Sequence, residues 1–122
     1  MAVTTQTVPT KIETKRINDS AVGAAAQEVA TSAITLFQVV IDNSGNSSEA
    51  VYLKLYDVAS APTLGTAKPD WQIPCPLSEK VGMTIPEGIA FANGLFYAVS
   101  KEAGVPTTTS PSANVALVLR TS

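Results

Sequence analysis

The stretch from Ala50 to Val58, AVYLKLYDV, alternates between two kinds of side chain. One set of positions is aliphatic and the other is aromatic or charged: Val51, Leu53 and Leu55 against Tyr52, Lys54 and Tyr56. Successive side chains of a β-strand point to opposite faces, so a period of two is typical of a strand. The pattern predicts a strand with one face in a core and the other wet or partly covered.

Comparable segments lie on both sides of this strand. Thr31–Asp42 is rich in β-branched and aromatic residues and is long enough for a central strand. Trp71–Ser78 contains prolines that cannot donate to a ladder, which favours an edge strand. Lys80–Pro86 and Val115–Thr121 complete the clear strand signals.

Turn signals separate these segments. Pro86-Glu87-Gly88 is expected to be a turn. Asn93-Gly94 predicts either a hairpin or a bulge within a single strand. For Ser20–Ala33 a short helix and an irregular extended link both remain open, because the alanines favour helix while Gly23 interrupts it.

These elements predict an all-β fold, an antiparallel β-sandwich of about seven strands, either jelly-roll or immunoglobulin-like. A chain of 122 residues is expected to form one domain. We assign residues 21–122 to the sandwich and residues 1–20 to an extended N-terminal arm, in which Thr10–Ile17 is a candidate edge strand. The predicted core consists of alternating aliphatic residues: Val51, Leu53, Leu55, Val115, Leu117 and Leu119.

The polar cluster from Asp42 to Glu49, DNSGNSSE, has two interpretations: a calcium loop or a turn between strands. An EF-hand loop needs Gly at its sixth position and Glu at its twelfth. Counted from Asp42, these positions hold Ser47 and Leu53, so the pattern fails. An irregular site of Asp42, Asn46 and Glu49 is the remaining metal-binding alternative, but Asn, Gly and Ser are the residues that a turn requires, and we favour the turn.

Patterns for catalysis are absent from the sequence. The chain has no histidine, which removes the usual partner of a nucleophile and the usual zinc ligand. Cys75 is therefore interpreted as a small, half-buried apolar residue. The acidic residues fall at expected strand ends and loops, where solvated carboxylates normally lie. We predict a protein that is not an enzyme, with no catalytic residue, no cofactor and no metal.

Composition limits the partners. A net charge of −2 argues against a general nucleic-acid binder. No apolar run approaches the roughly 20 residues that cross a bilayer, and the N-terminus lacks an export signal, so neither a membrane nor secretion is expected. Only 15% of the residues are charged, which fits either a surface covered by a partner or one wetted by Ser and Thr.

Several segments resemble a group of small virion structural proteins of tailed bacteriophages. The resemblance covers roughly Ile41 to Leu119. Its motifs are VYLKLYD, PTLGT followed by PD, IPEGIAF, and the Thr/Ser/Pro-rich loop before the last strand. It implies a β-sandwich protein of the virus particle, most simply a cement or decoration protein on the outer surface of the capsid, made in the host cytoplasm. The implied partners are the major capsid protein and further copies of this chain.

In that role the arm (Val3–Ile17) and the loops Ala59–Asp70 and Lys101–Asn114 are expected to touch neighbouring subunits. The candidate partner contacts are Val3, Val8, Lys11, Ile12, Lys15, Arg16, Tyr52, Tyr56 and Trp71. For the aromatic residues, packing within the domain, an interface between subunits and a sugar platform all remain open. The alternative function is a tail, neck or fibre-tip component that binds a host receptor or glycan.

Overall fold

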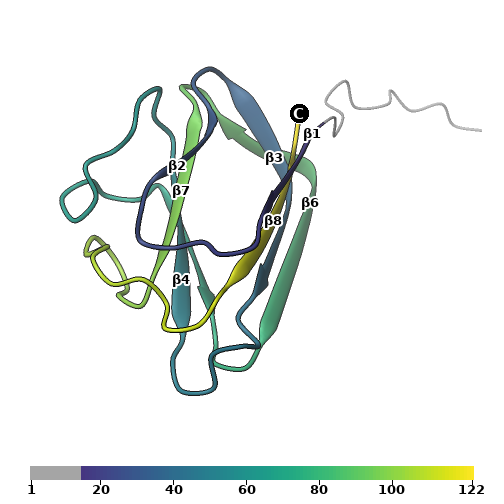
Figure 1. Ribbon diagram of the computed structural model, residues 1–122. Helices are drawn as coiled ribbons and strands as arrows, with labels where there is room; N and C mark the ends of the chain where they lie inside the picture. The colour runs from purple at the N-terminus through teal and green to yellow at the C-terminus, as the bar shows by residue number, and fades with distance from the viewer. Residues whose placement is uncertain (1–14) are drawn as a thin grey trace, which may run out of the picture.

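The computed structural model describes residues 15–122, which form eight β-strands and no helix (Figure 1). The strands are β1 (Lys15–Asp19), β2 (Gln27–Ala30), β3 (Ile34–Asp42), β4 (Val51–Tyr56), β5 (Trp71–Cys75), β6 (Lys80–Phe91), β7 (Leu95–Ser100) and β8 (Ala116–Thr121).

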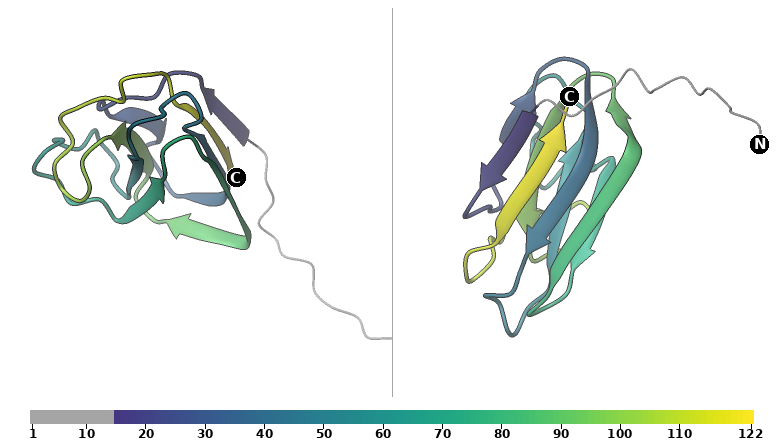
Figure 2. Two further views of the ribbon diagram at one scale, coloured as in Figure 1. Left: turned by 90° about the horizontal axis from the view of Figure 1, so that it is seen from below. Right: turned by 90° about the vertical axis from the view of Figure 1, so that its right-hand side faces the viewer.

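The strands form two antiparallel sheets that pack face to face. One sheet has the order β1-β8-β3-β6, which the right-hand view of Figure 2 shows side by side, and the other has the order β2-β7-β4-β5. Each strand of the first half of the chain thus neighbours its mirror partner from the second half: β1 with β8, β2 with β7, β3 with β6 and β4 with β5. These nested pairs define a jelly roll, so the immunoglobulin-like alternative is wrong.

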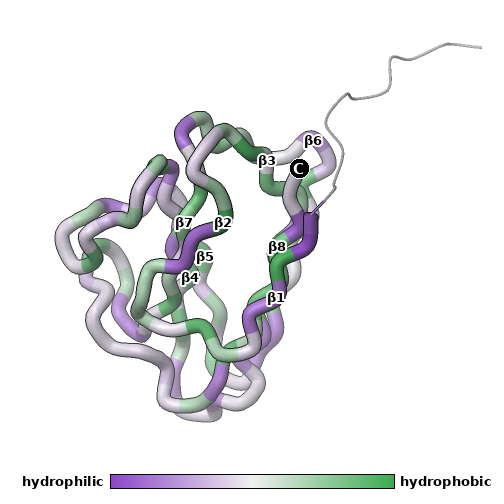
Figure 3. The backbone as a smooth tube through the Cα atoms, turned by 45° about the horizontal axis from the view of Figure 1, so that its top comes forward, coloured by the Kyte–Doolittle hydropathy of each residue, from purple (hydrophilic) through white to green (hydrophobic). Residues whose placement is uncertain are grey.

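The core lies between the sheets and confirms the alternation predicted from the sequence. Val51, Leu53 and Leu55 of β4 are fully buried, and they face Leu117 and Leu119 of β8 across the sandwich. Val115, which precedes β8, is also buried. In Figure 3 the hydrophobic segments lie on the inner strands, whereas the edge strand β1 is mostly hydrophilic.

A second, smaller apolar cluster covers the outer face of the sheet that contains β4. Tyr56, Phe96 and Ala98 are buried there, beneath Val58, Leu64 and Ala67 of the loop after β4. Two long loops, 57–70 and 101–115, lie over this side of the sandwich (Figure 1). The outer face of β4 is therefore covered by the chain's own loops.

β1 shortens the predicted arm. Lys15–Asp19 pairs antiparallel with β8, from Lys15 opposite Thr121 to Asp19 opposite Leu117, so these residues belong to the sandwich. Of the candidate edge strand Thr10–Ile17, the last three residues belong to β1. Its other residues lie within 1–14, outside the described part of the chain. Within Ser20–Ala33 the extended alternative is correct, because Gln27–Ala30 forms β2.

Two predicted turns have a different structure. Pro86-Glu87-Gly88 lies inside β6, at an irregularity in its pairing with β3 that lies between Leu36 and Gln38. Gly88 has a φ of +78°, so the turn-forming residues serve a bulge. Asn93-Gly94 is neither a hairpin nor a bulge, because β6 and β7 belong to opposite sheets and this dipeptide crosses between them.

Candidate functional site

The polar cluster Asp42–Glu49 connects β3 to β4 and therefore crosses from one sheet to the other. Asn43 is buried, and its Nδ2 donates hydrogen bonds to the carbonyls of Glu49 and Pro76, each at 3.0 Å. Its Oδ1 accepts a hydrogen bond from Asn46 Nδ2 at 2.8 Å. These contacts join the loop to the start of β4 and to the connection between β5 and β6, so the asparagines have a structural role.

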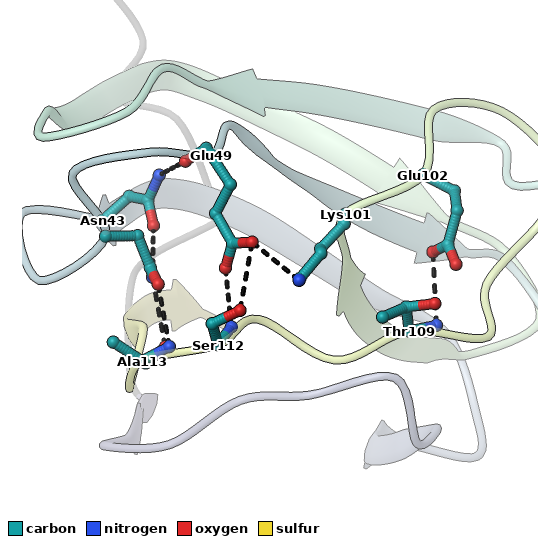
Figure 4. Close-up of polar contacts among 8 residues, drawn as sticks. Asn43, Glu49, Lys101, Glu102, Thr109, Ser112 and Ala113 are labelled. Carbon is teal, nitrogen blue, oxygen red and sulfur yellow. Dashed lines mark hydrogen bonds and ion pairs between the residues drawn. The ribbon is translucent and has the colours of Figure 1, made fainter.

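The same loop is joined to the loop before β8. Asn46 is buried and makes two hydrogen bonds to the backbone of Ala113, accepting one at 2.8 Å and donating one at 3.1 Å. The carboxylate of Glu49 accepts a hydrogen bond from the Ser112 amide at 2.6 Å and forms an ion pair with Lys101 at 2.8 Å (Figure 4). The Lys101 ammonium is the main cause that lowers the pKa of Glu49. The loop between β3 and β4 is therefore held to the loop before β8 by hydrogen bonds and one ion pair.

Two charged residues organise the long loop before β8. Hydrogen bonds from Thr109 and then Thr108 lower the pKa of Glu102 to about 2. Lys54 is fully buried, and its Nζ donates to the carbonyl of Pro106 and, at 3.0 Å, to the hydroxyl of Thr107. Burial lowers the pKa of Lys54. Lys54 therefore holds this loop onto β4, whereas Glu102 joins residues within the loop.

Cys75 is completely buried rather than half-buried, at the end of β5. Its Sγ lies 3.8 Å from the carbonyl oxygen of Ile41 and 3.5 Å from that of Glu79. Burial raises the pKa of this thiol. Such a thiol is protonated and shielded at neutral pH, as expected of a structural cysteine.

Within residues 15–122, no group of three or more acidic, cysteine or histidine side chains is placed to hold a metal ion. The same residues include no helix that is both long and apolar enough to cross a bilayer. Asp42 accepts hydrogen bonds from the side chain and then the amide of Ser44, which lower its pKa, as in an ordinary Asx turn. The loop is a turn region, in agreement with the interpretation favoured from the sequence.

Exposed apolar side chains lie along one open side of the sandwich. The large hydrophobic side chains that are exposed in the described residues are Trp71 (49%), Leu77 (49%) and Met83 (37%). Trp71 lies on β5, Met83 on β6 and Leu77 in the short connection between them. Together with the half-buried Ile73 and Val81, these three residues form what we call the β5–β6 seam.

The register explains why the seam is apolar. Trp71 and Ile73 are opposite the core residues Leu55 and Leu53 of β4, and Met83 is opposite Val39 of β3. Residues directly opposite each other in a ladder point to the same face, so these side chains point toward the space between the sheets. Because β5 and β6 are edge strands, no further strand closes that space.

The predicted contact residues fall into three groups. Val3, Val8, Lys11 and Ile12 lie outside the described residues, while Lys15 and Arg16 are exposed on β1. Trp71 is exposed in the seam, and Tyr52 is partly buried. Tyr56 is only 1% exposed, so its assignment as a partner contact is wrong: the loops of this chain cover it, and its hydroxyl lies 3.5 Å from that of Thr107.

Sequence reasoning missed Leu77 and Met83. Met83 belongs to the alternation of Val81, Met83 and Ile85, which predicts a strand but does not say that the strand lies at an edge. Leu77 follows the proline that ends the edge strand, and a large aliphatic residue at that position was an available signal.

Comparisons of the chain with protein-family models, with curated proteins and with solved structures give no match.

Proposed function

We propose that this protein is a non-enzymatic structural protein of a bacteriophage particle, a cement or decoration protein that binds the outside of the capsid. The observation that carries the proposal furthest is the β5–β6 seam. It collects Trp71, Leu77 and Met83 on one side of a domain whose other apolar residues are largely covered. Large apolar side chains exposed on one side of an otherwise well-packed domain are candidates for an interaction site.

The structure of the loops supports a binding role over a catalytic one. The charged groups at the end near Asn43 and Asn46 are used in contacts within the chain, including Glu49 with Lys101 and Glu102 with Thr108. Such contacts rigidify loops, and rigid loops suit a protein that adds stability to a shell. The jelly roll is common among capsid proteins, which is support by analogy only.

In this role the partners are the major capsid protein and further copies of the chain, and the protein is located on the outer surface of the virion. Each copy needs only modest affinity, because many copies on a symmetric lattice bind with avidity. Lys15 and Arg16 lie exposed on β1, at the sheet edge opposite β6, and can supply polar contacts to a second neighbour.

A tail, neck or fibre-tip component that binds a host glycan is the second candidate. One observation favours it: the Trp71 side chain is half exposed, and an exposed indole can stack on a sugar ring. The jelly roll also occurs in lectin domains.

The test is co-sedimentation of the purified protein with phage heads that lack it. We expect saturable binding that raises the temperature at which the heads release their DNA. The double variant Trp71→Ala/Met83→Ala removes the exposed apolar side chains of both edge strands, and we expect it to bind at least tenfold more weakly. Glu28→Ala, at an exposed position of β2 on the opposite edge of its sheet from β5, is the control and is expected to bind as the parent protein does.

Two outcomes would contradict the proposal. The first is that the parent protein stays in the supernatant when the heads are pelleted, and the second is that the double variant binds as tightly as the control variant. Retention of the protein on a glycan array, abolished by Trp71→Ala, would move the assignment to the receptor-binding alternative.

A further inference from the structure

The four edge strands of the sandwich differ in how well they are protected against pairing with another chain. β1 carries Lys15 and Arg16, β2 has only four residues with an irregular register, and β5 is interrupted by Pro74. Charges, short strands and proline are the usual devices that block edge-to-edge pairing. The first part of β6, Lys80–Thr84, has regular pairing with β3 and a single charge, so it is the least protected edge.

The register with β3 shows which backbone N–H and C=O groups of β6 are free to pair with another strand. The Asn43 amide donates to the Glu79 carbonyl at 2.9 Å, so residues 43 and 79 form a hydrogen-bonded pair just before the ladder. Such pairs alternate with pairs that are not hydrogen-bonded. Lys80, Gly82 and Thr84 therefore direct their N–H and C=O groups away from β3, toward the open edge.

The sequence contains a segment that matches this edge. Residues 10–14, TKIET, are five residues without proline, as are Lys80–Thr84. Across residues 1–14, eight of the fourteen residues are β-branched, the type that favours strands. The segment ends where β1 begins, so it is covalently continuous with an existing strand.

One antiparallel register places an apolar pair on the inner face of the sheet and an opposite-charge pair on the outer face. With Ile12 opposite Val81, Glu13 lies opposite Lys80, and Lys11 lies opposite Gly82. Val81 faces the seam, so Ile12 would extend the apolar strip of Trp71 and Met83. Apolar and opposite-charge pairs of this kind each stabilise a sheet. Pro9 ends the pairing, because it has no N–H to donate.

The acceptor must belong to another copy of the chain. Lys15 is level with Ile89 of the same sheet, through Thr121 and Leu36, whereas Lys80 lies at the opposite end of β6. Lys15 and Lys80 are three strand spacings apart across the sheet and six residues apart along β3, from Leu36 to Asp42. Together these separations amount to about 25 Å. Glu13, two residues before Lys15, reaches only about 7 Å from it.

We propose that residues 10–13 of one copy pair antiparallel with Lys80–Met83 of a second copy and extend its β1-β8-β3-β6 sheet. The contact is head-to-tail, since an edge near β1 of one copy meets β6 of the next. Repetition of such a contact produces a closed ring or an open chain. This inference deepens the self-association that forms part of the proposed function.

The test uses two full-length single-cysteine-addition variants, Ile12→Cys and Val81→Cys, mixed under mild oxidation. Residues 12 and 81 form a pair that is not hydrogen-bonded, whose Cα separation of about 4.5 Å permits a disulfide. We expect a covalent dimer in the mixture that neither variant forms alone. Native Cys75 is buried and is expected to stay reduced in the parent protein.

Lys11→Cys mixed with Val81→Cys is the matched control, because side chains 11 and 12 point to opposite faces of the strand. We expect little cross-linking in that mixture. Equal cross-linking in both mixtures, or none with Ile12→Cys, would overturn the inference. A disulfide confined to single chains of an Ile12→Cys/Val81→Cys double variant would also overturn it, since it would place the segment on its own β6.

A charge exchange provides a second readout without cysteine. Glu13→Lys and Lys80→Glu are each expected to weaken self-association about fivefold, measured by sedimentation velocity, and the double variant is expected to restore it. Failure of the double variant to recover would contradict the register. If the protein cross-links as expected but does not bind phage heads, only the cement role is refuted. If it binds heads but does not cross-link, only this contact is refuted.

Discussion

Asn43 provides the most demanding test of how the loops are held together. In Asn43→Ala the Glu49 carbonyl loses this donor, the Pro76 carbonyl keeps only the Glu79 amide at 3.3 Å, and Asn46 loses one of its acceptors. A buried polar group without a partner costs about 1–3 kcal/mol. One carbonyl without this donor, one carbonyl with a single remaining donor and one weakened amide, at the low end of that range, amount to about 3 kcal/mol, a large share of the roughly 5–15 kcal/mol that stabilises a domain.

The measurement is urea unfolding followed by tryptophan fluorescence. With a urea dependence of about 2 kcal/mol per molar, the unfolding midpoint of Asn43→Ala is expected to fall by about 1.5 M. The control is Asn114→Ala, at an exposed position in the neighbouring loop, which is expected to change the midpoint by less than about 0.3 M. A loss below about 1 kcal/mol for Asn43→Ala would refute the assignment of Asn43 as the residue that joins these loops.

Asn43→Asp adds a pH dependence to the same test. The new carboxyl would face carbonyl oxygens and is buried, so both effects would raise its pKa in the folded state. A raised folded-state pKa means that stability is present at low pH and lost as pH rises through that pKa. We expect Asn43→Asp to be less stable than Asn43→Ala at pH 7 and to approach it at pH 4, with Asn114→Asp as the control. A difference that does not change with pH would contradict the burial of this side chain.

Three further predictions concern other parts of the sandwich. Gly88→Ala should lose at least about 2 kcal/mol in urea unfolding, because Gly88 has a φ of +78° and an added Cβ would lie 2.2 Å from Thr35; full stability would show that the bulge relaxes. Lys54→Met should lose about 1.5–3 kcal/mol and speed proteolysis in the Lys101–Asn114 loop, because two charge-assisted hydrogen bonds are removed; a more stable variant would show that burying the ammonium costs more than those bonds contribute. Burial and the hydrogen bond to Asp19 raise the pKa of Tyr97, so its stabilising effect should persist below pH 10 and decline above it, and Tyr97→Phe should remove that decline in alkaline unfolding curves.

The strands were predictable because their signal is local. Alternation in AVYLKLYDV requires only that neighbouring side chains point to opposite faces, and the buried residues of β4 and β8 follow it. The proline in Trp71–Cys75 likewise indicated an edge strand, which the sheet order confirms. The fold class, the main strands and most of the core therefore followed from the sequence.

The turns show where local signals stop. Pro86-Glu87-Gly88 and Asn93-Gly94 contain good turn residues, but the same positive φ serves a bulge or a crossing between sheets. Which of these forms depends on the partner strand, and that is decided by packing over the whole domain. The jelly-roll order was undetermined for the same reason.

The candidate site divides in the same way. The sequence by itself determined that Trp71 lies on an edge strand, and that the cluster Asp42–Glu49 lacks the spacing of an EF-hand. Only the tertiary structure decided that Tyr56 is covered while Met83 and Leu77 are exposed. A period of two assigns a side chain to a face of its strand, but whether that face meets water depends on which loop or sheet folds over it. That information lies in contacts between residues far apart in the chain, such as Lys54 with Pro106.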